Sequence, residues 1–202
     1  MGWFGFNGGS QLAMGTAVDA IAVSTIFMNT FLAGAGGVMA AAFTTRLGFG
    51  KTDVIQMLNG CIGGLVAITA EPLMPSPIAA ILIGAVGGVI VVFGTKLLFS
   101  MKIDDVVGAV PAHLFAGIWG TLAVPITNPD VSFGAQLLGV ISINAFVFVV
   151  SYIVWSIMKA TIGIRLSKEG ELKGTDVTET GVIAYAISCL LYTSPSPRDG
   201  LL

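Results

Sequence analysis

The chain has 202 residues, of which 55% are hydrophobic and 10% are charged, and its formal net charge is -2. Its mean hydropathy is +0.93, and its glycines are spread through the apolar stretches rather than gathered in linkers. This composition excludes a soluble globular domain, gives no sign of a nucleic-acid partner, and indicates an all-α protein that crosses a membrane several times.

The sequence predicts a short apolar N-terminal piece followed by membrane-spanning helices. Met1 to Phe6 is too short to cross a bilayer, because a spanning helix needs about 20 apolar residues. Most of the later stretches are long enough, and the shorter stretch at 54–70 becomes a span because its neighbours need a return crossing. The predicted spans are residues 19–45, 54–70, 78–100, 106–126 and 134–162.

The charges fix the topology of these spans. All lysines and arginines then fall on one side of the membrane, at positions 46, 51, 96, 102, 159, 165, 168, 173 and 198. The opposite loops carry Asp19, Glu71 and Asp130 and no basic residue. By the positive-inside rule, the basic side and the C-terminus are cytoplasmic, as in a multi-pass protein of the plasma or inner membrane.

Small residues recur at the spacing that lets helix backbones approach closely, in Gly60-Cys61-Ile62-Gly63-Gly64 and Gly84-Ala85-Val86-Gly87-Gly88. These segments predict a tightly packed bundle. Gly34-Ala35-Gly36-Gly37 lies inside a span with no strand before it, so we do not interpret it as a phosphate-binding loop. Cys61 and Cys189 are far apart, and we expect no disulfide, metal site or cofactor.

His113 is the single histidine, and it lies near the middle of an uncharged stretch, Val106 to Ile126. An ionisable side chain inside a membrane is a functional-site hypothesis by default. A charged ring would be costly there, so we expect a neutral imidazole that offers one hydrogen-bond donor and one acceptor. The alternative is a structural histidine bonded to a backbone carbonyl of a neighbouring helix.

Asp104 and Asp105 begin the helix that carries His113. A carboxylate pair at this place either caps the helix and compensates its dipole or forms a cation site, and we favour the cap. The chain has no Ser-His-Asp, HExxH or paired intramembrane carboxylate pattern, so we do not expect an enzyme.

Several segments, taken in order and spacing, resemble the ammonium transporter (Amt/Mep/Rh) family. They are Gly2-Trp3-Phe4-Gly5-Phe6-Asn7-Gly8-Gly9-Ser10, Asn59 to Thr69, Ile103-Asp104-Asp105 followed by His113 and Gly117-Ile118-Trp119-Gly120, and Gly163-Ile164-Arg165 with Gly174-Thr175-Asp176 and Gly181. The resemblance covers about residues 1–185 and implies the second half of the family fold, from the end of the sixth helix through the eleventh. This half is the second inverted repeat plus the last long helix.

The resemblance implies a pathway for ammonium, ammonia or methylammonium, without separating ammonia from carbon dioxide. His113 resembles the second of the paired pore histidines, whose partner belongs to the absent fifth helix. Trp3 resembles the tryptophan of the outer recruitment site, and Phe6 resembles a phenylalanine that gates the outer mouth. Without the motif, both aromatics would be read as membrane-interface anchors. Ala109, one helical turn before His113, would line the same conduit.

Two positions near the pore histidine depart from the family pattern. Leu114 stands where the family commonly has glycine, and Pro111 would loosen the helix by removing a backbone donor. Either change could alter the orientation of the His113 ring.

We expect three parts: a partial membrane domain at 1–163, a cytoplasmic tail at 164–186, and a Ser/Pro-rich extension at 187–202 that is disordered or artefactual. Because Met1 falls within what resembles the sixth helix of the family, we expect a fragment of a longer protein. The family implies a homotrimer when full length, with a tail addressed by nitrogen-signalling proteins. The alternatives to a transporter are a non-conducting membrane sensor or regulatory subunit and an inactive partial product.

Overall fold

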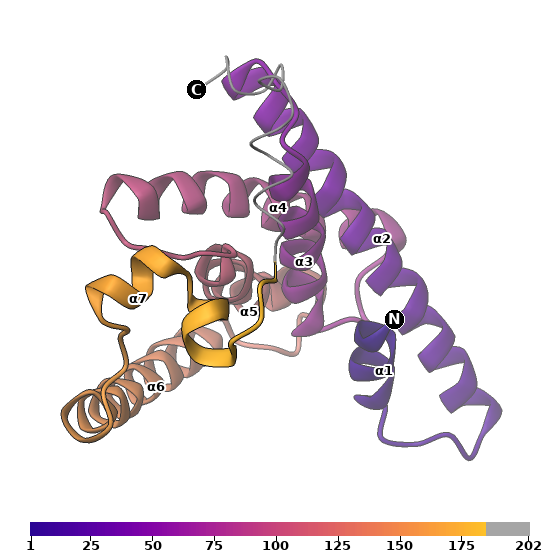
Figure 1. The fold of residues 1–202 in the computed structure, drawn as a ribbon. Coiled ribbons are helices and arrows are strands. Elements are labelled where there is room, and N and C mark those ends of the chain that lie inside the picture. Colours follow the sequence, from indigo (N-terminus) through magenta and orange to yellow (C-terminus); the bar gives the residue numbers. More distant parts are fainter. Residues whose placement is uncertain (185–202) are drawn as a thin grey trace. The chain divides into compact units, whose positions relative to one another are not determined.

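A computed structural model describes residues 1–184, and every regular element among them is helical (Figure 1). This architecture confirms the predicted all-α class. The elements are α1 (Gly2–Gly9), α2 (Ala17–Phe49), α3 (Val54–Thr69), α4 (Pro77–Ser100), the π-helical η1 (Val110–Phe115), α5 (Ala116–Thr127), α6 (Phe133–Thr161), α7 (Lys168–Lys173) and the π-helical η2 (Asp176–Thr180). The extension at 187–202 and Cys189 lie outside the described residues.

Each predicted span overlaps a helical stretch of the structure, although residues 106–109 precede η1 and residues 70 and 162 follow the ends of α3 and α6. The helices α2, α4 and α6, and the continuous stretch Val110–Thr127, are long and apolar enough to cross a membrane. The helix α3 is apolar but has 16 residues, so its length alone does not reach a full span. That α3 crosses the membrane, as the loop charges predict, stays a prediction.

Polar side chains begin the helices of the bundle, because the first backbone N–H groups of a helix have no partner inside it. Each cap accepts a hydrogen bond from the N–H three residues later: Thr16 from Asp19 at 3.2 Å, Asp53 from Gln56 at 3.1 Å, and Ser76 from Ala79 at 3.3 Å. At the other end of α2, Gly50 takes a left-handed conformation with a φ of 78°. These caps fix where the chain turns back between helices.

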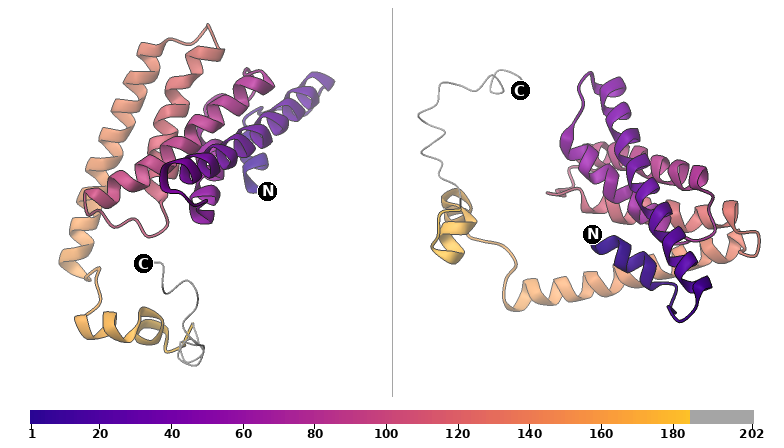
Figure 2. Two further views of the ribbon diagram at one scale, coloured as in Figure 1. Left: turned by 90° about the horizontal axis from the view of Figure 1, so that it is seen from above. Right: turned by 90° about the vertical axis from the view of Figure 1, so that its right-hand side faces the viewer.

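The helices α2, α3 and α4 lie side by side and pack through glycine (Figures 1 and 2). A Cβ atom added to Gly37 would collide with the Gly60 carbonyl and come within 3.1 Å of the Gly64 Cα atom. An added Cβ atom at Gly84 would collide with the backbone of Ala33. The prediction that glycines let these backbones approach closely is therefore confirmed.

The chain divides into two compact units, residues 1–146 and the part from residue 147 onward. The division falls inside α6, which has no buried residue along its length. The first unit holds α1 to α5 and the first half of α6, and all of the candidate site described below lies in it. The predicted end of the membrane domain at residue 163 stays a prediction.

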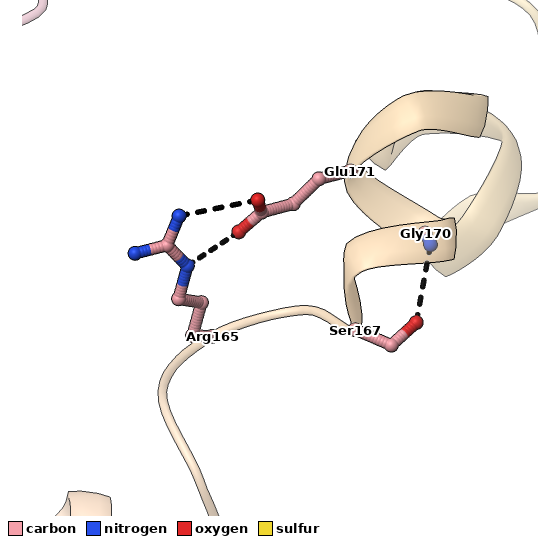
Figure 3. A network of polar contacts seen from close by, with 4 residues as sticks. All are labelled: Arg165, Ser167, Gly170 and Glu171. Atoms are coloured by element: carbon pink, nitrogen blue, oxygen red, sulfur yellow. Dashed lines mark hydrogen bonds and ion pairs between the residues drawn. The ribbon is translucent and has the colours of Figure 1, made fainter.

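In the second unit, the tail after α6 makes its own polar contacts (Figure 3). The Arg165 guanidinium donates to both carboxylate oxygens of Glu171, at 2.5 and 3.1 Å. The Ser167 hydroxyl accepts the Gly170 N–H at 3.1 Å and begins α7. The hydrogen bond from Arg165 lowers the pKa of Glu171, and the same contact raises the pKa of Arg165.

Candidate functional site

The helix that carries His113 is anchored at its start by polar contacts. The Asp105 carboxylate accepts the N–H groups of Ala109 and Val110, at 2.9 and 2.8 Å. Gly108 turns the chain with a φ of 73°, and the Asn59 side-chain amide of α3 donates to the Val107 carbonyl at 2.9 Å. Asp105 thus acts as a cap, and this first turn is tied to α3.

The two aspartates of this turn differ in role. Asp104 is exposed and has no side-chain hydrogen bond within residues 1–184, whereas Asp105 is partly buried and bonded. The Asp105 carboxylate accepts hydrogen bonds from backbone N–H groups at the start of the helix, as a helix cap does. It therefore favours the cap over the cation site for Asp105.

The turn that contains His113 is wound as a π-helix, from Val110 to Phe115. Pro111 lies at the start of this turn, where a missing N–H is tolerated. Single π-helical turns are rare and occur mostly at functional sites, because the wider turn changes the direction of the side chains that follow. The loosening expected from Pro111 is therefore seen as a π-helical turn. Both His113 and Leu114 are exposed on this turn.

The α1 helix brings Trp3 against His113. The two rings are stacked, with centroids 6.2 Å apart and planes inclined by 21°. The indole N–H of Trp3 donates to the Thr69 hydroxyl of α3 at 2.8 Å, so the ring is held in place by its polar atom. The structure therefore places Trp3 beside His113, and its role in outer recruitment stays a prediction.

Phe6 also lies beside Trp3. The Trp3 and Phe6 rings meet edge to face, with centroids 6.4 Å apart, and the Phe6 side chain is 64% exposed. Trp3 thus contacts both of the other predicted site rings. Ala109 is exposed four residues before His113, and its role as a wall residue stays a prediction.

Two cavities adjoin this row of rings. One has a volume of about 430 Å³ and is lined by Met1, Gly2, Trp3, Phe6 and Leu65. The other, of about 300 Å³, lies between η1–α5 and the first half of α6; His113, Leu114 and Thr121 line one wall, and Gln136 and Asn144 line the other. No Asp, Glu, Lys or Arg side chain lines either cavity, so the surroundings of His113 suit a neutral solute that forms hydrogen bonds.

Some residues of the site were not singled out from the sequence. Asn59 and Thr69 stand at the two ends of the quoted segment in α3, but nothing in that segment shows that they bond to Val107 and Trp3. Asn144 and Gln136 could have been found, because an amide inside a long apolar helix is a recognisable signal.

Comparison with known proteins gives a family for the chain. The model of the Ammonium Transporter Family matches residues 1–185. The chain is 38% identical to Ammonium transporter Amt2 of Archaeoglobus fulgidus over 205 residues, which cover 91% of this chain and 43% of that protein. It is 40% identical to a putative ammonium transporter of Synechocystis over 185 residues, which cover 90% and 42%. The chain spans less than half the length of these curated relatives.

Solved structures show the same similarity. A protein titled Sensor Amt Protein superimposes with a TM-score of 0.81 at 29% identity, over 89% of this chain and 46% of that chain. Mep2 of Candida albicans superimposes with a TM-score of 0.73 at 25% identity, over 83% and 41%.

Proposed function

This chain belongs to the ammonium transporter family, and we propose that it forms one wall of a pathway by which ammonium crosses a membrane as ammonia. The observation that carries this proposal is the contact between Trp3 and His113, which joins a cation-binding ring to a hydrogen-bonding ring in surroundings without charged side chains.

The first step that we propose is capture at Trp3. An ammonium ion is attracted to the face of an aromatic ring, and indole gives the strongest such attraction. The Trp3 ring lines an open cavity, and its bond to Thr69 holds it beside His113. Capture therefore takes place next to the histidine, after the solute has passed the exposed Phe6 gate.

The second step is loss of a proton. Moving an ion into a dry apolar passage costs several kcal/mol, and a neutral molecule costs far less. Ammonium gives up its proton to a separate relay of histidine or water. It continues as ammonia, which forms hydrogen bonds with the neutral His113 ring. Potassium is rejected because it has no proton to lose.

The proposed pathway needs more than this chain. The relatives are more than twice as long as the matched region. In this proposal the histidine that pairs with His113 belongs to the part of the protein that this chain does not span. We infer that the complete protein is a homotrimer with one pathway in each subunit. The basic end of the bundle and the tail are cytoplasmic in this proposal, and the tail is a contact for nitrogen-signalling proteins.

A second candidate function is that of a non-conducting membrane sensor. The observation that favours it is the superposition on a protein titled Sensor Amt Protein, together with a tail that holds its own ion pair and cap. In that case the same site binds ammonium without passing it.

Methylammonium uptake in yeast without its own ammonium permeases tests the proposal. We compare the chain alone with a chimera in which residues 1–184 replace the corresponding half of the Archaeoglobus Amt2 protein. We expect uptake by the chimera and none by the chain alone, because the second wall is absent. A chimera that reaches the membrane and binds methylammonium without uptake would favour the sensor. A chimera that neither binds nor transports would contradict both.

A further inference from the structure

Basic side chains from two helices converge on one turn at the end of α2. Arg46 Nη1 donates to the Gly50 carbonyl at 2.8 Å. The Lys96 ammonium group of α4 lies 4.6 Å from the centroid of the Phe49 ring. Because Phe49 and Gly50 are consecutive residues, both cations are held at the same turn, and Lys51 follows directly. We call Arg46, Phe49, Gly50, Lys51 and Lys96 the Phe49 cluster.

The charges of the Phe49 cluster are not neutralised by carboxylates. Within residues 1–184, the one ion pair joins Arg165 and Glu171, so Arg46, Lys51 and Lys96 have no carboxylate partner there. The nearest acid in sequence, Asp53, accepts the Gln56 N–H and caps α3. Arg46, Lys51 and Lys96 are all exposed. The C-terminal end of α2 carries a partial negative charge, which favours cations at this turn.

Each held cation shares a helix face with an exposed aromatic side chain. Phe43 precedes Arg46 by one helical turn and is 57% exposed, and Phe93 precedes Lys96 by one turn and is 55% exposed. The cluster therefore joins an apolar band, which faces the acyl chains of a membrane, to a cationic end. A phospholipid with an anionic headgroup has the complementary arrangement, with acyl chains below and a phosphate above.

We propose that the Phe49 cluster binds the headgroup of an anionic phospholipid in the cytoplasmic leaflet. Arg46 and Lys96 contact the phosphate, and Lys51 adds charge at its outer side. Phe49 positions Lys96, since the attraction between an ammonium group and a ring fixes the side chain before the lipid arrives. This inference does not depend on transport, so it stands or fails separately from the proposed function.

Binding of a fluorescent phosphatidylglycerol to the purified chain in neutral detergent micelles tests the proposal. A few lipids in a neutral micelle create no charged surface, so affinity reports the site rather than general attraction to a membrane. We expect Arg46→Gln and Lys96→Gln each to weaken binding roughly fivefold. The matched control is Lys102→Gln, which removes the same charge just beyond the same end of α4 but outside the cluster, and it should leave the affinity unchanged.

Phe49→Leu keeps every charge and removes the ring that holds Lys96. We expect it to weaken binding less than Lys96→Gln, which would separate positioning from charge. Equal losses in Lys96→Gln and Lys102→Gln would overturn the proposal, because they would indicate unspecific attraction. So would equal binding of phosphatidylcholine, or full competition by soluble glycerol phosphate, which would indicate a site for free phosphate. A chain that does not prefer phosphatidylglycerol to phosphatidylcholine would also overturn the proposal. An acidic protein would then be the better candidate partner for this surface.

Discussion

Where α2, α3 and α4 meet, backbone contacts backbone, whereas around His113 the side chains stand apart and leave cavities. At the first place, a Cβ atom at Gly37 would collide with the Gly60 carbonyl. At the second, His113 is exposed and lines a cavity of about 300 Å³. Both regions belong to the same compact unit.

The comparison shows that one region, where α2, α3 and α4 meet, supports the fold, and that another region, around His113, is open to a solute. The glycine contacts hold three helices backbone to backbone, where an added Cβ atom has no room. The polar contacts of Asp105 and Asn59 then attach the His113 turn to this support. The ring itself stacks on Trp3, and because it is exposed it stays open to a solute. Substitutions in the two regions should therefore have different consequences.

Gly37→Ala should have the largest effect on folding. Both clashing groups belong to the backbone, so neither can rotate away, and we expect a loss of about 1–3 kcal/mol or more in the free energy of unfolding. The matched control is Gly48→Ala in the same helix, where an added Cβ atom meets nothing within 4 Å. Thermal unfolding followed by circular dichroism in detergent checks both. Equal stability of the two variants would show that α2 does not pack through Gly37.

Asp105→Ala should have the next largest effect, of about 1 kcal/mol, since it removes the acceptor for two backbone N–H groups. Asp104→Ala is its control, because it removes the neighbouring carboxylate, which makes no such bond in the described chain. The same unfolding measurement applies. If Asp104→Ala were the more damaging change, the cap would have been assigned to the wrong carboxylate.

Trp3→Leu in the chimera should leave the fold intact and weaken capture. We expect the half-saturating methylammonium concentration to rise roughly two- to fivefold, with a smaller change in the maximum rate. Thr69→Val is the matched variant, because it keeps the Trp3 ring and removes only its hydrogen bond. A smaller shift in the same direction would agree with a positioning role for Thr69. An unaltered concentration dependence in Trp3→Leu would count against capture at this ring.

The smallest effect is expected in the tail. Because the contact with Arg165 lowers the pKa of Glu171 below its ordinary value of 4.5, the pair stabilises the tail above that pH. This contribution is lost as the pH falls through the lower pKa of the folded state. Backbone NMR shifts of α7 should change in that acidic range, and salt should weaken the effect because both groups are exposed.

Glu171→Gln should reproduce the acidic shifts at neutral pH. Glu169→Gln is the control, since Glu169 has no ion-pair partner within residues 1–184. Identical spectra of the two variants would exclude a role for the Arg165 pair in ordering α7.

The helices could be predicted from the sequence because a membrane requires long apolar stretches in the spans and gathers basic residues in the loops of one side. It did not predict which faces meet, because α2 is apolar on all sides and glycines mark close approach without naming a partner. The pairing of Trp3 with His113 joins two residues that are far apart in the chain, and no local pattern encodes it. The π-helical turn was likewise missed, since Pro111 indicated a disturbed helix but not the way in which it is wound.

Uptake by the chimera with His113→Ala tests the central claim most directly. The ring is exposed, so its removal should leave folding and the amount at the membrane unchanged. The account predicts that methylammonium uptake is lost, or that potassium begins to leak. Unchanged uptake with unchanged selectivity would show that His113 is a structural residue and would remove the basis of the proposed pathway.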